Sequence, residues 1–174
     1  GAVRNLTGLH APRWNDASLS ELNFPMTVDT QEKADGLAQV TQMAADEFVK
    51  RYEAQLAATD TATLKAAAEV IGKWALASPT PFALVHGDYR LDNLMFGEDP
   101  EDVVALDWQT LGVGSPTRDL AYFIGTGLAT PLRREAEREL VGAYHDELLR
   151  RGIAGYDFDQ CFHDYRLGQL QAPL

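Results

Sequence analysis

The chain has 174 residues, enough to bury one hydrophobic core, and this length predicts a single domain. Its formal net charge of −11 disfavours nucleic acid as a partner and would suit a cationic substrate. The single cysteine, Cys161, allows no internal disulfide, and no apolar run approaches the roughly 18 residues of a membrane span. We therefore expect a cytoplasmic protein with no membrane partner.

The first half of the chain predicts helices. Residues 1–10 read as the tail of a helix that ends at Ala11-Pro12, and the following stretch as far as Val28 is irregular. A long amphipathic helix is predicted from Asp29 to about Ala57, and a second one from near Asp60 to just before Pro79. The apolar stripes that we expect to face the core are Leu37, Val40, Ala44, Phe48 and Tyr52 in the first helix, and Leu64, Ala68, Ile71 and Ala75 in the second.

The middle of the chain predicts short strands. Phe82 to Val85 is an apolar run that suits a short buried strand. Two further runs, 94–96 and 103–106, flank the polar and turn-rich segment 97–102, which predicts a β-hairpin. Asn93 would open the first arm and Asp107 would close the second, so antiparallel pairing would place these two residues side by side.

After a loop at Gly112–Gly114, the last third again predicts helices. Ser115-Pro116 starts one that runs to about Gly127, and Thr130-Pro131 starts another that ends at Gly152. The last helix begins at Asp157 and is expected to reach Leu174. The predicted fold class is therefore mainly α with a small β-hairpin element (α+β).

The chemistry gathers in the pattern His86-x-Asp88-x-x-x-x-Asn93, with Asp107 at the end of the hairpin. Phosphoryl transfer from a metal-bound nucleotide needs a base that orients a hydroxyl, and oxygen ligands for Mg²⁺. Taken singly, an Asp or Asn beside a strand is more often a turn former, and a His next to a Gly is usually structural. The joint pattern favours a site, with Asn93 and Asp107 suited to the metal and Asp88 free to face a substrate hydroxyl.

The segments HGDYRLDNLM (86–95) and LDWQ (106–109) resemble the catalytic and metal loops of the aminoglycoside phosphotransferase and choline kinase-like family. That family is similar in turn to protein kinases, but the Trp-Gln pair after Asp107 is usual for small-molecule kinases. The resemblance implies that Asp88 is the catalytic base and that Asn93 and Asp107 bind Mg²⁺. It also implies that His86 is a buried brace of the loop.

Two further residues carry open alternatives. Arg90 falls where protein kinases place a phosphate-contacting lysine, so it either stabilises the transferring phosphoryl group or is merely solvated. The segment Ser115–Ala121 resembles the P-x-x-D-L-A of the family, whose Asp binds the catalytic loop from the start of a helix. Asp119 would then support the site, although an acid in a first helical turn needs no function to explain it.

The nucleotide-binding parts of a kinase are not recognisable in this sequence. It contains no G-x-G-x-x-G loop ahead of the motif and no strand lysine paired with a helix glutamate. The resemblance therefore implies that residues 1–174 are the C-terminal lobe of a protein kinase-like fold, with the N-terminal nucleotide lobe absent. We expect a fragment of a longer protein, inactive or nearly so alone, that can self-associate through the face left by the missing lobe.

The function implied for the intact protein is transfer of the γ-phosphoryl group of ATP, with Mg²⁺, to a hydroxyl of an aminoglycoside-, choline- or sugar-like molecule. One alternative is a non-catalytic binding domain on a degenerate kinase scaffold, against which the retained Asp and Asn residues argue. The other is a metal-dependent phosphohydrolase, which would want more metal-binding side chains. The remaining histidines, His10, His145 and His163, show no ligand spacing.

Overall fold

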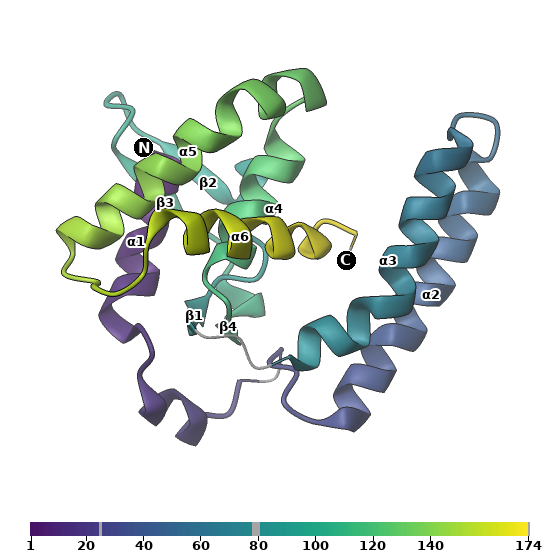
Figure 1. Ribbon diagram of the computed structural model, residues 1–174, viewed down its shortest axis with the longest axis horizontal. Coiled ribbons are helices and arrows are strands. Elements are labelled where there is room, and N and C mark those ends of the chain that lie inside the picture. The colour runs from purple at the N-terminus through teal and green to yellow at the C-terminus, as the bar shows by residue number, and fades with distance from the viewer. Residues whose placement is uncertain (25, 78–80, 174) are drawn as a thin grey trace. The chain divides into compact units, whose positions relative to one another are not determined.

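The computed structural model describes residues 1–24, 26–77 and 81–173, and most of them are helical (Figure 1). Contacts divide the chain into two compact units, one made of residues 1–27 and 79–172 and the other centred on residues 28–78. The prediction of a mainly α fold with a small β-hairpin element is confirmed. Within the described residues, no helix is both long enough and apolar enough to cross a bilayer.

The unit centred on residues 28–78 is a pair of helices, α2 (Gln31–Tyr52) and α3 (Ala58–Leu76), which lie side by side. They approach closely, because a Cβ added at Gly72 would lie 2.7 Å from the backbone oxygen of Ala34. The predicted stripe of α3 is confirmed, but that of α2 is wrong, since Val40 and Phe48 are exposed. Small side chains line the contact instead, because only they allow such an approach; in α2 the buried residues are Ala34, Thr41 and Ala45.

The other unit holds the main hydrophobic core. Its helices are α1 (Ala2–His10), α4 (Thr117–Gly127), α5 (Thr130–Arg150) and α6 (Phe158–Gly168). Helix α4 packs against α6, and α1 against α5 (Figure 1). The largest apolar side chains that they bury completely are Leu6, Leu120, Ile124, Tyr144, Leu148 and Tyr165.

Two pairs of short antiparallel strands lie in this unit. Strands β2 (Leu94–Phe96) and β3 (Val103–Ala105) form the predicted hairpin, in which Leu94 pairs with Ala105. Strand β1 (Ala83–Val85) pairs with β4 (Gly112–Gly114), where the sequence predicts a loop. Gly-Val-Gly has a weak intrinsic preference for the strand conformation, so contacts with distant residues are needed to stabilise this strand. One of these contacts is the hydroxyl of Thr27, which accepts a hydrogen bond from the Val113 N–H at 3.0 Å.

The predicted helix ends are correct in part. Asp157 caps α6 by accepting from the Gln160 N–H at 2.8 Å, and Gly152 takes a left-handed backbone just after α5, with φ of +90°. Asp60 is not the cap of α3: the helix begins two residues earlier, and the Asp60 carboxylate accepts from the N–H of Ala57. After α6 comes a 3₁₀ turn, Gln169–Gln171, and the predicted helix end at Leu174 lies outside the described residues.

Candidate active site

The loop that follows β1 carries the predicted site, and a buried carboxylate holds its backbone. Asp119, in the first turn of α4, is 1 % exposed. One of its oxygens accepts the N–H of His86 at 2.6 Å, and the other accepts the N–H of Gly87 at 2.9 Å. Two successive backbone groups are thereby fixed by one side chain, so the direction in which the chain enters the loop is set from α4.

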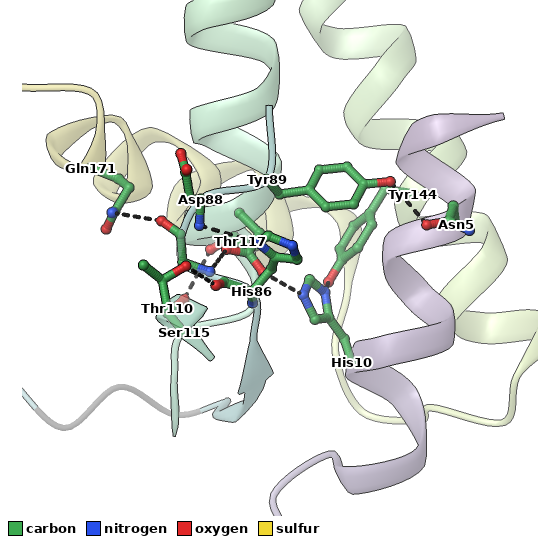
Figure 2. Close-up of polar contacts among 12 residues, drawn as sticks. Asn5, His10, His86, Asp88, Tyr89, Thr110, Ser115, Thr117, Tyr144 and Gln171 are labelled. Atoms are coloured by element: carbon green, nitrogen blue, oxygen red, sulfur yellow. Dashed lines mark hydrogen bonds and ion pairs between the residues drawn. The ribbon is translucent and has the colours of Figure 1, made fainter. Parts of the chain in front are cut away.

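A third donor reaches Asp119 from the end of α1. His10 Nε2 lies 3.2 Å from the same oxygen that binds His86, and His10 Nδ1 lies 2.8 Å from the Tyr144 hydroxyl (Figure 2). A carboxylate only accepts hydrogen bonds, so Nε2 carries the hydrogen in this pair. Burial raises the pKa of Tyr144 well above its ordinary value, which keeps its hydroxyl protonated and able to donate to Nδ1. Neither His10 nor Tyr144 was predicted to belong to the site.

His86 links the loop to the end of the hairpin. Its Nε2 donates to the backbone oxygen of Leu106 at 2.9 Å, and its Nδ1 accepts from the N–H of Asp88 at 3.3 Å. The ring also packs against that of Trp108, with centroids 4.8 Å apart. Because Nε2 donates and Nδ1 accepts, the ring carries its hydrogen on Nε2. Through these two bonds His86 connects Asp88, the candidate base, to Leu106, the residue before the candidate metal ligand Asp107.

Two further contacts close around the loop backbone. The Thr110 hydroxyl donates to the backbone oxygen of His86 at 2.7 Å, and the Gln171 amide donates to that of Gly87 at 3.3 Å (Figure 2). Gly87 has φ of +83°, and a Cβ there would lie 2.6 Å from the backbone oxygen of Thr110. Glycine is therefore required at this position by both conformation and space.

The structure brings Asp88 and Asn93 into direct contact. The amide nitrogen of Asn93 donates to both the backbone oxygen and a carboxylate oxygen of Asp88, each at 2.9 Å. Because these bonds fix the orientation of the amide, its oxygen Oδ1 is left available as a ligand. Arg90 Nε lies 3.2 Å from the second oxygen of Asp88, while its NH1 lies 3.3 Å from Asp92. Arg90 is thus half exposed and ion-paired within the loop.

Asp107 is placed at the hairpin end as the sequence predicts. The N–H of Leu106 donates to the backbone oxygen of Asn93 at 2.8 Å, and Asp107 follows directly. Its backbone is left-handed, with φ of 60°, which is uncommon outside glycine and tolerated best by Asp and Asn. The side chain is exposed, and its Oδ2 accepts a hydrogen bond from the Gln109 amide at 3.5 Å.

The residues present fit a weakly held Mg²⁺ and no stronger metal site. Among the described residues, no three His, Cys, Asp or Glu side chains gather closely enough to hold a metal ion. Asn93 and Asp107 offer an amide oxygen and a carboxylate, which are hard ligands of the kind that Mg²⁺ uses alongside phosphate and water. Their assignment as ligands, like that of Asp88 as base, stays a prediction.

Comparison with known proteins places the chain in a family. The model of the ecdysteroid kinase-like family matches residues 17–152, which is well over half of the chain. Acyl-CoA dehydrogenase family member 10 of Mus musculus is 38% identical over 77 residues, covering 42% of this chain and 7% of that protein. Family member 11 of Homo sapiens is 49% identical over 41 residues, or 23% of this chain and 5% of that protein.

The chain thus spans less than a tenth of the length of these curated relatives. Among solved structures, aminoglycoside phosphotransferase APH(3'')-Id from Streptomyces rimosus aligns with 89% of this chain and 64% of its own, at 21% identity and a TM-score of 0.46. That likeness is too distant to support an argument about function. The family match alone is decisive, and it shows that the chain belongs to the ecdysteroid kinase-like family.

Proposed function

We propose that this protein transfers the γ-phosphoryl group of ATP, with Mg²⁺, to a hydroxyl group of a small molecule. The observation that carries the proposal is the contact between Asp88 and Asn93, which leaves the Asn93 amide oxygen free beside the hairpin end at Asp107. A base and two hard oxygen ligands on one loop and one hairpin are what such a transfer requires. Membership of a kinase-like family supports the same reaction.

Each residue has a distinct role in this proposal. Asp88 accepts a hydrogen bond from the acceptor hydroxyl and takes its proton as the new bond to phosphorus forms. Asn93 and Asp107 hold Mg²⁺, which when bound neutralises charge on the phosphates. Arg90 is ion-paired to Asp88 with its side chain 44% exposed, so it can turn toward a transferring phosphoryl group.

An apolar surface suited to a nucleobase adjoins these residues. Met95 and Val104 are opposite partners in the hairpin, and both are exposed. Leu106 lies two residues beyond Val104, so it shares their face, and it is exposed as well. A flat aromatic base placed there would cover apolar side chains directly beside the candidate metal ligands, which favours a nucleotide as the phosphoryl donor.

The acceptor belongs to the class of hydroxylated small molecules. The net charge of −11 favours a cationic one, such as an aminoglycoside or a choline-like alcohol. The family description names ecdysteroids, which adds steroid alcohols to the candidates. The dehydrogenase names of the relatives describe proteins of which the matched segments are 7% or less, so they suggest no reaction for this chain.

The proposal is tested by calorimetric titration of Mg-ATP into the 174-residue chain and into the Asp107→Asn variant. Asparagine tolerates the left-handed backbone of this position, so the change removes a charged ligand with little effect on folding. We expect the wild-type chain to bind and the variant to bind at least about tenfold more weakly, since loss of even an outer-shell partner typically weakens metal binding that much. Asp146→Asn, on the exposed face of α5, is the matched control and should bind like wild type.

Equal affinity of wild type and Asp107→Asn would reject Asp107 as a ligand, and no binding by the wild-type chain would reject nucleotide binding at this site. With binding in hand, a panel of aminoglycosides, choline, sugars and steroid alcohols is screened for acceptor-dependent release of ADP by the intact protein, because the 174-residue chain is expected to be inactive or nearly so alone. Asp88→Asn should abolish that release while leaving Mg-ATP affinity largely unchanged. Release that survives this variant would remove Asp88 from the role of base.

A further inference from the structure

The catalytic loop, residues 86–91, begins with a stretch whose backbone is held by side chains from elsewhere in the chain. Asp119 accepts hydrogen bonds from the first two N–H groups of the loop. The first carbonyl oxygen accepts from a threonine hydroxyl, and the second, that of Gly87, accepts from the Gln171 amide (Figure 2). The peptide unit between Gly87 and Asp88 is therefore bound from the 3₁₀ turn that follows α6.

This peptide unit is bound at both of its polar groups. Its oxygen accepts from the Gln171 amide at 3.3 Å, and its N–H, which belongs to Asp88, donates to His86 Nδ1, also at 3.3 Å. In a trans peptide the C=O and N–H groups point in opposite directions, so the two bonds together fix the rotation of the unit about its long axis. That rotation sets φ of Asp88, and φ influences the direction in which the Asp88 side chain leaves the backbone.

Glycine at position 87 makes another orientation of the peptide unit accessible. A rotation by half a turn changes ψ of Gly87 and φ of Asp88. Glycine tolerates nearly all such changes, and Asp is one of the few other residues that tolerates a left-handed backbone. Gly87 already has φ of +83°, where only glycine is comfortable. Contacts with side chains, rather than backbone sterics, must therefore select one orientation.

The orientation of the Gln171 amide is itself fixed by Arg118. The Nε of Arg118 donates to Gln171 Oε1 at 3.3 Å, and a guanidinium can only donate. The amide oxygen therefore faces Arg118, and the NH₂ group faces the loop. Burial lowers the pKa of Arg118 to about 10, so the guanidinium is still charged at neutral pH. Arg118 directly precedes Asp119, so the same turn of α4 directs the bonds to both sides of the loop backbone.

We propose that Gln171 is a positioning residue that holds the Gly87–Asp88 peptide unit in one orientation, and with it the Asp88 carboxylate. The inference rests on the proposed kinase function, in which Asp88 takes the proton of the acceptor hydroxyl. Without the Gln171 amide, the unit keeps only its bond to His86. The population of the rotated orientation should then rise about fivefold, the factor that one neutral hydrogen bond provides.

Solvent exchange of backbone amides in the 174-residue chain, measured by NMR, tests this without any turnover. Gln171→Met keeps the length of the side chain and removes its amide. Because rotation withdraws the Asp88 N–H from His86, that N–H should exchange about fivefold faster in the variant. The Gly87 N–H belongs to the preceding peptide unit and stays bonded to Asp119, so its exchange should be unchanged.

Two further variants separate the bond to the loop from the packing of the turn. At neutral pH, Gln171→Glu keeps an acceptor for Arg118 but cannot donate to the Gly87 oxygen, so it should behave like Gln171→Met. Gln169→Met changes the other glutamine of the same 3₁₀ turn, whose side chain lies against Gly125 in α4. It is the matched control, and its Asp88 N–H should exchange as in wild type.

Each contrary outcome overturns the inference for a different reason. Unchanged exchange of the Asp88 N–H in Gln171→Met would mean that the amide does not hold the peptide. Wild-type exchange in Gln171→Glu would mean that only the contact with Arg118 matters. Faster exchange of the Gly87 N–H as well, or the same acceleration in Gln169→Met, would mean that the turn merely supports packing. The proposed function is judged separately, by the Mg-ATP titration, so a failure of either can be told from a failure of the other.

Discussion

Replacement of Asp119 tests how much the hydrogen bonds between its carboxylate and the catalytic loop contribute to the stability of the fold. In Asp119→Asn, one carboxylate oxygen becomes an NH₂ group, which cannot accept. The retained oxygen can serve His86 and His10, which share one carboxylate oxygen in wild type, so the N–H of Gly87 loses its acceptor. An unsatisfied buried donor costs about 1–3 kcal/mol, and we expect the free energy of unfolding to fall by that amount.

Asp119→Ala should be worse than Asp119→Asn. It strands all three donors at a position that is 1% exposed, and breaking a buried charged network typically costs about 3–5 kcal/mol. Urea unfolding followed by tryptophan fluorescence measures both variants, with exposed Asp146→Asn as control. Stability of Asp119→Asn within about 0.5 kcal/mol of wild type, the range of ordinary surface changes, would refute the reasoning that these bonds hold the loop.

Two further predictions follow from local geometry. Gly87→Ala should lower the melting temperature, because the φ of Gly87 is +83° and the new Cβ would lie 2.6 Å from a backbone oxygen. Gly36 lies in α2 with open space around it, so Gly36→Ala should instead raise the free energy of unfolding by up to about 1 kcal/mol. Similar melting temperatures for the two variants would contradict this. In Asp88→Asn, the phenol pKa of Tyr122 should fall, since the carboxylate charge that opposes ionisation is removed while burial remains. A ¹⁹F NMR titration of fluorotyrosine-labelled protein measures it, and an unchanged or higher pKa would show that the two groups do not interact.

The parts of the site that the sequence predicted are those set by local pattern. Two apolar runs around a turn predict the hairpin. The hairpin brings Leu106 into a backbone hydrogen bond with Asn93, and Asp107 follows Leu106 directly. Both residues sit where a strand begins or ends, which is visible without any tertiary information. The loop between His86 and Asn93 is equally local, because its internal bonds span seven residues or fewer.

The parts that were missed depend on contacts between distant segments. The histidine of α1 reaches Asp119 across 109 positions, and the Gln171 amide reaches the loop across 84. No periodicity in α1 distinguishes His10 from any other histidine at the end of a helix. The α2 stripe failed for a related reason: helical spacing finds an apolar face, but the face that packs is the one whose alanines allow the backbone of α3 to come close.

The polar contacts around the loop help to distinguish a catalytic loop from that of a degenerate, non-catalytic scaffold. A buried carboxylate paired with a buried histidine is costly to desolvate, and apolar replacements of similar shape are often as stable or more so. Such a network adds little to stability in return for that cost, but it does fix one geometry of the backbone it binds. Here it fixes the chain just ahead of Asp88, from α1, α4 and the 3₁₀ turn after α6. A binding domain on a degenerate scaffold would not need the orientation of one carboxylate to be fixed in this way, so the arrangement favours a catalytic role for Asp88.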